Sequence, residues 1–345
     1  MNKIHKLFLL LVVGILIVSC GKDDDQYIAP PRDYAVQYPV DLANIDKFLD
    51  EYYMEVSTDY DVTFAKIPSP NPDSRVSIRL QTAYPLQFKM VNRNEVDYKV
   101  YYISLREGVN ERPSRVDSAY VSYKGTSLFI KKVPVVPATT PITYVETLTT
   151  AQFDYAQTPI WFKLEDVVPG WQEIIPLFKT GNYDSTPGPN PISFTNFGAG
   201  VMFLPSGLGY YNTSPNSNLP GYSSLIFTFK LNNQQFRDHD SDGILSKEEV
   251  DPLVVGQNPK DYDSDGDGFA NMFDLDDDGD HYLTKNERKY VNPLNPGVSY
   301  FYPFTGAATD DPSTPFVDER QGIPNCSGDY TTSTRLRKHL DPSCH

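Results

Sequence analysis

Cysteine, histidine and tryptophan are scarce in this sequence. It holds three cysteines, five histidines and two tryptophans among 345 residues. No cysteine belongs to a C-x-x-C pair, which argues against a structural zinc site. No Ser/His/Asp or Cys/His set stands in a context typical of covalent catalysis, so an enzyme that works through a nucleophile is not favoured. Positive charge is also in deficit, because the net charge is −15, and this argues against nucleic acid as a partner.

Aromatic, turn-forming and acidic residues are what the sequence has in quantity. There are 24 tyrosines and 19 phenylalanines, which suit strands and apolar pockets, and 29 prolines and 21 glycines, which suit turns. Sixteen acidic residues and three lysines lie between Asp238 and Glu287, so this one segment carries most of the negative charge. The length allows one or two domains, and the acidic segment is expected to bind cations.

The first twenty residues have the features of an export signal. Lys3 and Lys6 precede an apolar run, Leu7–Val18, that is short for a membrane-spanning helix. The run ends in Ile-Val-Ser-Cys20, which resembles the lipobox of bacterial lipoproteins. That resemblance implies a signal peptide over 1–19, a lipid on Cys20 that anchors the chain to the membrane, and a tether over 20–40. An ordinary secretory signal remains the alternative.

The sequence also bears on which membrane the lipid would enter. Gly21-Lys-Asp-Asp-Asp25 resembles the acidic tag of some surface-exposed Gram-negative lipoproteins, although a solvated tether is an equal alternative. We therefore expect an outer membrane lipoprotein that faces the periplasm or the cell surface. In such an oxidising compartment Cys326 and Cys344 are predicted to form a disulfide, which would stabilise the tail, residues 291–345, by about 3 kcal/mol.

Hydrophobic periodicity predicts the secondary structure. A helix is expected from Asp41 to Tyr53, with Asp41 as its cap, and a second, short helix from Trp171 to Phe178. Strands are expected at Val62–Ile67, Val76–Leu80, Phe88–Val91, Tyr98–Leu105, Ser118–Tyr123, Val201–Leu204 and Ser224–Leu231. A threonine-rich loop is expected to run up to Thr150. Residues 41–96 are interpreted as an N-terminal extension without chemistry of its own, and one helix against an antiparallel sheet is an α+β arrangement.

Five segments follow one another in an order that resembles the FKBP family of peptidyl-prolyl cis–trans isomerases. They are Tyr101–Gly125 (YYISLREGVNERPSRVDSAYVSYKG), Phe153-Asp154, Val167–Gly181 (VVPGWQEIIPLFKTG), Leu204–Tyr210 (LPSGLGY) and Leu219–Leu231 (LPGYSSLIFTFKL). Each segment alone is weakly specific, whereas the ordered set is strong. The resemblance implies an FKBP-like domain over 97–232, in which an antiparallel sheet wraps a short helix, with long insertions after Gly125 and Gly181.

The resemblance also implies a substrate site. By the position of each residue in its segment, the expected catalytic residues are Tyr123, Phe153, Asp154, Val167, Val168, Trp171, Tyr210 and Phe227. Trp171 would form the floor of the pocket, and Tyr210 would donate its hydroxyl. Ile160, which falls where many members have an aromatic wall, and Leu219 would line the substrate pocket.

The implied chemistry needs no nucleophile and no cofactor. Rotation about an X–Pro bond is opposed by C–N resonance, with a barrier of about 18–20 kcal/mol. A dry aromatic bowl that seats the proline ring would disfavour the planar amide. Preset donors such as the Val168 N–H and the Tyr210 hydroxyl would then stabilise the rotated state. The expected substrates are proline-containing polypeptides.

Three acidic loops lie within residues 237–290. Asp238, Asp240, Asp242, Ile244 and Glu249 fit the EF-hand pattern D-x-D-x-D-G-x5-E, with Ser246 as a further ligand, direct or through water. The second loop would use Asp263, Asp265, Asp267, Phe269 and Asp274, and the third would use Asp276, Asp278, Asp280 and Glu287. The third has His281 in place of glycine, and a register starting at Asp274 is also possible. These chained loops resemble thrombospondin type-3 repeats, which implies structural Ca²⁺; a solvated acidic linker is the alternative.

The predicted molecule is thus an α+β, FKBP-like domain followed by a small, loop-rich module stabilised by calcium. Its predicted function is that of a membrane-anchored folding helper, a peptidyl-prolyl isomerase that acts on exported proteins. A non-catalytic peptide-binding, adhesion or scaffold lipoprotein on the same fold is the alternative. A role as an accessory subunit of a secretion or motility machine has no residues here that would distinguish it.

Overall fold

The computed structural model describes residues 30–135, 141–184, 192–291, 295–304, 322–329, 332 and 334–344. The chain divides into Met1–Asp33 and one compact unit, Tyr34–His345. The expected signal peptide over 1–19 and the expected lipid site at Cys20 lie outside the described residues. Within the described part of the chain, no helix is both long enough and apolar enough to cross a membrane.

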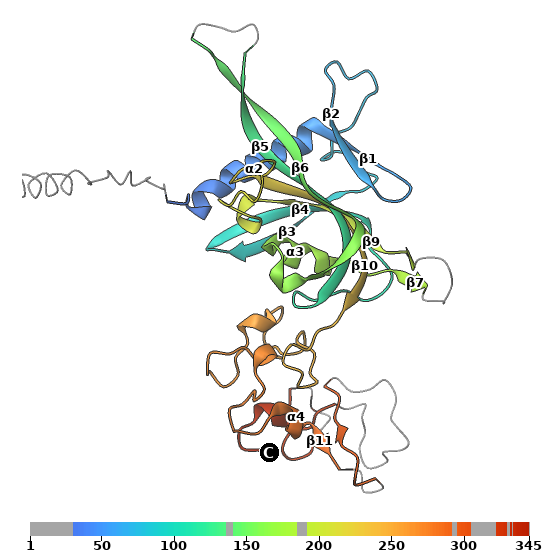
Figure 1. Cartoon of the computed structure of the whole chain (residues 1–345), viewed down its shortest axis with the longest axis vertical. Coiled ribbons are helices and arrows are strands. Elements are labelled where there is room, and N and C mark those ends of the chain that lie inside the picture. The colour runs from blue at the N-terminus through green and yellow to red at the C-terminus, as the bar shows by residue number, and fades with distance from the viewer. Residues whose placement is uncertain are drawn as a thin grey trace, which may run out of the picture. The chain divides into compact units, whose positions relative to one another are not determined.

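The largest element is a six-stranded antiparallel sheet with the strand order β3-β4-β9-β10-β5-β6 (Figure 1). Its strands are Leu86–Arg93 (β3), Val96–Arg106 (β4), Ser118–Pro134 (β5), Tyr144–Lys163 (β6), Gly198–Leu204 (β9) and Ser224–Gln235 (β10). An antiparallel sheet with few helices confirms the α+β class that the sequence predicted.

The sheet is buried on both faces because apolar side chains alternate along its strands. In β4, Tyr98 and Val100 belong to the core that includes helix α3 (Pro169–Ile174). Ile103, on the opposite face, packs in the core that includes helix α2 (Tyr34–Glu51). The two helices therefore cover opposite faces, whereas the sequence predicted a single covering helix.

The short helix after β6 begins earlier and ends earlier than predicted. Pro169 occupies the first turn of α3, where its fixed φ suits a helix and its missing N–H costs nothing. The chain then tightens into a 3-10 turn at Ile175–Leu177 that contains Pro176. The predicted helix Trp171–Phe178 is therefore split at the proline, which cannot supply the hydrogen bond that an α-helix needs.

The N-terminal extension is an integral part of the sheet domain. Helix α2 begins at Tyr34, so the end of the predicted tether is helical, and Asp41 is not its cap but a fully buried residue inside it. The predicted boundary at residues 96 and 97 falls at the start of β4, where that strand pairs with β3. The helical spacing of apolar residues predicts a helix only from Asp41 onward. The helix begins earlier, at Tyr34, because Tyr34 and Tyr38 pack on the core.

Two further predictions differ from the structure. Residues 76–80 form a turn and not a strand; Ile78 is buried there, and its N–H donates to the carbonyl of Tyr52. The segment expected to be a threonine-rich loop is instead part of the long hairpin of β5 and β6, whose pairing runs from Ser118 to Pro134 with two register shifts. Threonine in that segment therefore acts as a β-former.

Small hairpins and a loop-rich segment complete the described chain. Strands Tyr52–Val56 (β1) and Val62–Lys66 (β2) pair, as do Asn182–Asp184 (β7) and Ser193–Thr195 (β8). After β10 the regular elements are short: α4 (Thr284–Glu287), β11 (Lys289–Tyr290) and β12 (Tyr300–Phe301).

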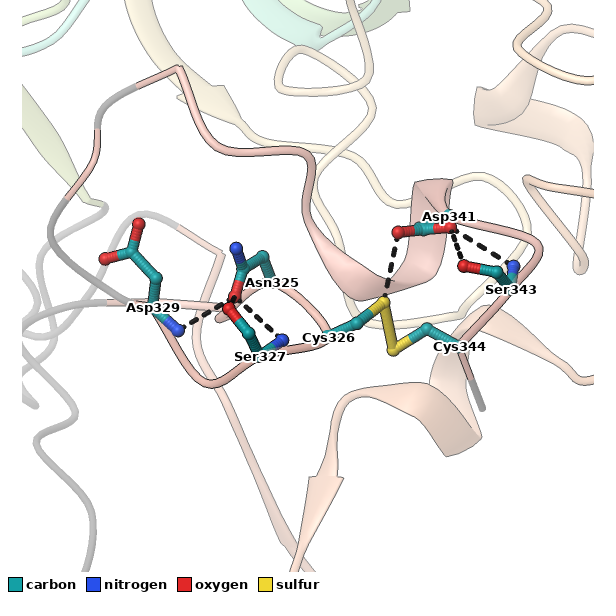
Figure 2. Close-up of a disulfide and its surroundings, with 7 residues drawn as sticks. All are labelled: Asn325, Cys326, Ser327, Asp329, Asp341, Ser343 and Cys344. Atoms are coloured by element: carbon teal, nitrogen blue, oxygen red, sulfur yellow. Dashed lines mark hydrogen bonds between the residues drawn. A yellow bond between two sulfur atoms is a disulfide. The ribbon is translucent and has the colours of Figure 1, made fainter.

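The interior of the C-terminal segment is unusually polar. Among the described residues, its buried apolar residues are Ile244, Met272, Ile323 and two prolines, Pro259 and Pro324, and its buried polar residues include Glu249 and Asp277. A disulfide joins Cys326 to Cys344 (Figure 2). With so little apolar area to bury, this segment depends on polar contacts and on cross-links for its order.

Candidate functional site

Four aromatic side chains that are far apart in the sequence meet on the α3 face of the sheet; we call them the aromatic cluster. They are Tyr123 of β5, Phe153 of β6, Trp171 of α3 and Phe227 of β10. The ring centroids of Trp171 lie 5.2 Å from Tyr123 and 5.3 Å from Phe227, with interplanar angles of 90° and 89°. Phe153 lies 5.7 Å from Phe227, also edge to face. Edge-to-face packing brings the rings together without a flat stack, so they form one apolar cluster on this face of the sheet.

Trp171 is fixed at the base of this cluster by the start of helix α3. Its side chain is buried, and its backbone N–H donates to the carbonyl of Val168, the residue that precedes the helix. Gly170 is required beside it because a Cβ there would lie 2.4 Å from a methyl carbon of Leu204. The indole Nε1 of Trp171 is buried and has no hydrogen-bond partner among the described residues. It is therefore a donor that faces an acceptor-poor site.

The rim of the cluster carries polar groups. The hydroxyl of Tyr123 donates to Oδ2 of Asp154 at 2.5 Å, and Tyr210, half-exposed, places its ring 6.2 Å from Phe153. Burial, and then the hydrogen bond to Asp154, raises the pKa of Tyr123. Burial, and then the negative charge of Asp154, raises the pKa of Tyr210. Both hydroxyls therefore stay protonated at neutral pH and remain donors.

The segment that enters helix α3 supplies further parts of the rim. Val167 and Val168 are partly buried against the same core. The carbonyl of Val167 accepts a hydrogen bond from Nε2 of Gln172 at 3.1 Å, which fixes its direction. The N–H of Val168 makes no hydrogen bond to the described residues. Leu219, predicted to line the pocket, is buried in this core.

Ile160, predicted to line the pocket, lies opposite Val121 of β5 and is 44% exposed. Phe162 lies two residues further along β6 and therefore on the same face of the strand. It packs 5.4 Å from Trp171 and 5.6 Å from Tyr123, and it was not predicted as a site residue.

A cavity of about 720 Å³ lies near the β1–β2 hairpin, and its lining residues also come from β5, β6 and β10. Its lining includes Tyr60, Lys124 and Lys230, and Lys230 forms an ion pair with Asp61 at 2.6 Å. Thr228, which also lines it, lies one residue from Phe227 on β10 and so points to the other face of the sheet. Of the aromatic cluster, Tyr123 also lines this cavity.

The acidic segment folds into three loops of the same design: Asp238–Glu249 (first loop), Asp263–Asp274 (second loop) and Asp276–Glu287 (third loop). In each, the carboxylate of residue one accepts the N–H of residue six, at 3.0, 3.0 and 2.9 Å. Residue six is left-handed in each, with φ of 94° at Gly243, 100° at Gly268 and 75° at His281. The third loop thus follows the register that starts at Asp276, and its histidine adopts the conformation that glycine adopts in the others.

The ninth residue of each loop closes the loop instead of pointing to its centre. The N–H of residue two donates to the side chain of residue nine: His239 to Ser246 at 3.1 Å, Ser264 to Asn271 at 2.9 Å, and Asp277 to Thr284 at 3.1 Å. Ser246 also contacts the ring of His239 at 2.8 Å. Its hydroxyl is therefore engaged within the loop, although the pattern had placed it among the ligands.

The remaining predicted ligand positions keep the loop arrangement. In each loop the side-chain carboxylate of residue five accepts the N–H of residue seven. In the first loop this N–H is that of Ile244, at 2.6 Å, and in the second it is that of Phe269, at 2.8 Å. Carboxylate oxygens within 4.8 Å of one another form four groups: Asp238/Asp240/Asp242, Asp240/Glu249/Asp277, Asp263/Asp265/Asp267 and Asp276/Asp278/Asp280. Asp277 was not predicted as a site residue, because the loop pattern gives residue two no role.

Several of these carboxylates are buried with oxygens that have no partner. Both side-chain oxygens of Glu249 and of Glu287, and one oxygen each of Asp242 and Asp277, have no hydrogen-bond partner among the described residues. Burial, and then the neighbouring carboxylates, raises the pKa of Glu249 to about 10 and that of Asp277 to about 9. Uncompensated buried carboxylates are costly, and a hard divalent cation such as Ca²⁺ is the group that suits an all-oxygen set.

The start of the first loop contacts the sheet domain. Nε2 of His239 lies 2.9 Å from Oε1 of Glu165, and the N–H of Arg237 donates to Asp117 at 3.0 Å. Glu165 immediately precedes the segment that carries Val167 and Val168. A contact therefore links the first acidic loop to the rim of the aromatic cluster.

Comparisons with known proteins give one partial match to a family and several distant structural likenesses. The family model described as BamM C-terminal matches residues 239–316. The chain is similar to a peptidyl-prolyl cis-trans isomerase of Pseudomonas syringae pv. tomato at 12% identity and a TM-score of 0.32, over 60% of this chain and 99% of the other. No curated protein matches the chain.

Two further solved structures are similar. FkpA from Escherichia coli has 21% identity and a TM-score of 0.26, over 40% of this chain and 48% of the other. The N-terminal domain of FKBP42 from Arabidopsis thaliana has 13% identity and a TM-score of 0.28, over 43% and 92% respectively.

Proposed function

We propose that the sheet domain is a peptidyl-prolyl cis–trans isomerase of the FKBP type that acts on X–Pro bonds. The observation that carries this proposal is the aromatic cluster, in which Tyr123, Phe153, Trp171 and Phe227 come together from four elements. An apolar cup of this kind suits the ring of a proline.

The chain's own groups would favour the rotated amide in two ways. The apolar walls would exclude water and so disfavour the polarised planar amide, whose resonance gives a barrier of about 18–20 kcal/mol. Donors at the rim would stabilise the carbonyl as it rotates: the Tyr210 hydroxyl, the Val168 N–H and the indole N–H of Trp171. The last of these is buried without a partner among the described residues, so it is preorganised to donate. Asp154 would orient the hydroxyl of Tyr123.

We also propose that the three acidic loops bind Ca²⁺ and that the ions have a structural role. Buried carboxylate oxygens without partners support this, because the folded segment holds like charges together. Binding and folding would then be coupled, so that Ca²⁺ orders the segment. Catalysis on the sheet domain would need no ion.

The proposed location is the outer membrane, through a lipid on Cys20, facing the periplasm or the cell surface. The lipobox-like residues before Cys20 support the anchor. The family model that matches residues 239–316 relates to outer-membrane assembly machinery, which agrees with a site at that membrane. Proline-containing exported polypeptides would be the substrates.

The same family match favours a second candidate function. A non-catalytic scaffold or peptide-binding lipoprotein, attached to assembly machinery through its C-terminal segment, would also use this fold. In that case the aromatic cluster would be a core or a binding site without turnover.

An isomerase assay on the full-length chain in detergent separates the two candidates. A proline peptide whose cleavage by a protease requires the trans form reports turnover, in the presence and absence of Ca²⁺. We expect the wild type to accelerate isomerisation and Tyr210→Phe to lower kcat/KM by about tenfold or more, because one rim donor is lost. Asp154→Ala and Trp171→Ala are expected to lower it as well.

Trp161→Ala is the matched control for Trp171→Ala. Trp161 is half-exposed and stacks on Tyr120 outside the aromatic cluster, so its loss should leave kcat/KM unchanged. A wild-type chain that is folded by circular dichroism but gives no acceleration over the uncatalysed rate would reject the isomerase and leave the scaffold.

A further inference from the structure

The centre of the first loop contains a buried carboxylate that belongs to another loop. Besides Asp240 and Glu249 of the first loop, its centre receives the carboxylate of Asp277 from the third loop, with the three ligand atoms within 4.8 Å of one another. Asp277 is 2% exposed and Glu249 is 4% exposed. Oδ1 of Asp277 and both side-chain oxygens of Glu249 lack partners among the described residues. Three carboxylates that converge out of water suit a bound cation, which would offset their mutual repulsion.

The hydrogen bonds of the first loop explain why a group from outside is needed. Ca²⁺ takes six to eight oxygen ligands, and an EF-hand loop often supplies one of them from its ninth residue. Here the ninth residue, Ser246, is turned toward His239, with which its hydroxyl makes two contacts of 3.1 and 2.8 Å. The first loop therefore lacks an oxygen from that position.

The backbone of Asp277 is held by the second and third loops. Its N–H donates to Thr284 of the third loop at 3.1 Å, and its carbonyl accepts a hydrogen bond from the hydroxyl of Ser264 of the second loop. Its carboxylate is not among those grouped in the centre of the third loop. The three carboxylates grouped in that centre are those of Asp276, Asp278 and Asp280.

Two basic residues, one near the end of the third loop and one just after it, hold that loop against the first. Nη1 of Arg288 donates to the carbonyl of Asp242 at 2.7 Å, and Nζ of Lys285 donates to that of Ser241 at 3.4 Å. Arg288 is itself buried. A Cβ on Gly243 would lie 2.0 Å from Nη1 of Arg288, so the two loops approach as closely as a glycine allows. The juxtaposition of Asp277 with the first loop is therefore built into the packing.

We propose that Asp277 is a ligand of the divalent cation held by the first loop, so that a single Ca²⁺ ties the first and third loops together. The ion would be bound by Asp238, Asp240, Asp242 and Glu249 of the first loop and by Asp277 in trans. This inference rests on the proposed role of the loops in binding Ca²⁺. A fifth carboxylate makes this the site of highest ligand charge, and therefore the tightest of the three.

The test is a calcium titration of the full-length chain in detergent against a chromophoric chelator, with Asp277→Asn compared with wild type. Asparagine keeps the shape of the side chain and removes its charge. We expect the tightest site to weaken by about tenfold or more, since loss of even an outer-shell partner typically weakens a metal site about 10–100-fold. Asp261→Asn, which removes an exposed carboxylate from the same segment, is the matched control and should leave all sites unchanged.

Two double variants show which ion Asp277 serves. In a Glu249→Gln background, Asp277→Asn should cause little further loss, because both act on one ion. In a Glu287→Gln background, its effect should be undiminished, because Glu287 belongs to the third loop. The reverse pattern would overturn the proposal.

Failure of the inference and failure of the proposed calcium role give different results. A wild-type chain that binds no Ca²⁺ at millimolar concentration would remove the calcium role and this inference with it. A wild-type chain that binds Ca²⁺ while Asp277→Asn behaves like Asp261→Asn would remove the inference alone.

Discussion

Gly125 illustrates how closely single residues constrain the aromatic cluster. It lies on β5 opposite Asp154 of β6, directly beneath two rings of the cluster. A Cβ added there would lie 2.8 Å from Cζ of Phe153 and 2.9 Å from Cε1 of Phe227. Such distances are below van der Waals contact, so at least one ring would have to move.

We therefore predict that Gly125→Ala damages both the fold and the site. The displaced rings should lower the free energy of unfolding by about 1–3 kcal/mol, the usual cost of overpacking a core. The isomerase kcat/KM should fall further than this loss of folded protein explains. Gly297→Ala is the control, because a Cβ there meets nothing within 4 Å. Urea denaturation and the isomerase assay measure the two effects, and equal behaviour of both variants would refute the prediction.

At the scale of elements, helix α2 braces the turn that presents Tyr210. The buried carboxylate of Asp41 accepts the N–H of Ser206 at 2.7 Å and its hydroxyl at 2.6 Å. Nε2 of Gln37 donates to the same carboxylate at 2.6 Å. One turn of helix earlier, Tyr34 stacks on Tyr211 with centroids 4.0 Å apart. Helix α2 thus fixes the turn that carries Tyr210, although the two segments are far apart in the sequence.

Asp41→Ala should loosen that turn. The N–H and hydroxyl of Ser206 would lose their shared acceptor in a buried place, which should cost about 1–3 kcal/mol of folding free energy. Turnover should fall with a larger change in kcat than in KM if the turn mainly positions Tyr210. Lys47→Ala, at an exposed position of the same helix, should change neither quantity. Hydrogen exchange of residues 206–211 would report the loosening directly, and unchanged exchange would contradict it.

At the scale of the whole molecule, the C-terminal segment contains buried carboxyl groups whose negative charge must be offset by bound protons or by cations. The pKa of Glu249 is raised to about 10, that of Asp277 to about 9 and that of Glu287 to about 8, in each case by burial first and by neighbouring carboxylates second. The tail covers part of this charge, since Arg337 and His339 line a small cavity with Glu249 and Asp277.

These shifts predict an inverted pH dependence in the absence of calcium. Below about pH 4 these groups are protonated in the folded and unfolded states alike and have no effect on stability. Above it the unfolded chain releases their protons while the folded chain retains them, so stability should fall as the pH rises toward 8–10. Excess Ca²⁺ should remove or reverse this trend, because the cation binds the deprotonated form.

Thermal melts of the C-terminal transition, at pH 6 and pH 8, with chelator or with Ca²⁺, would measure the effect. The chelated chain should melt lower at pH 8 than at pH 6. The double variant Glu249→Gln, Asp277→Asn, which removes two of the shifted groups, should show a weaker dependence. A chelated chain that is more stable at the higher pH would disprove this account.

The residues that form local patterns could be predicted from the sequence alone. The antiparallel sheet, the α+β class and most strand positions follow from alternation and β-formers, and local spacing within each loop depends only on neighbouring residues. The positions of Tyr123, Phe153, Trp171 and Phe227 were indicated by ordered segments, although the resemblance said nothing of the angles between their rings.

What only the tertiary structure decided depends on contacts between distant segments. The contacts of Phe162 with Trp171 and Tyr123 depend on how β6 packs against α3 and β5, which no spacing in the sequence encodes. Asp41 is a buried acceptor instead of a helix cap because Ser206 lies beside it in the fold. Asp277 stands at the second position of its loop, to which the loop pattern gives no ligand role. Because the third loop packs on the first, its carboxylate nevertheless lies beside those of Asp240 and Glu249 in the first loop. In each case a contact between residues far apart in the sequence decides where the side chain lies, and local sequence patterns do not contain such contacts.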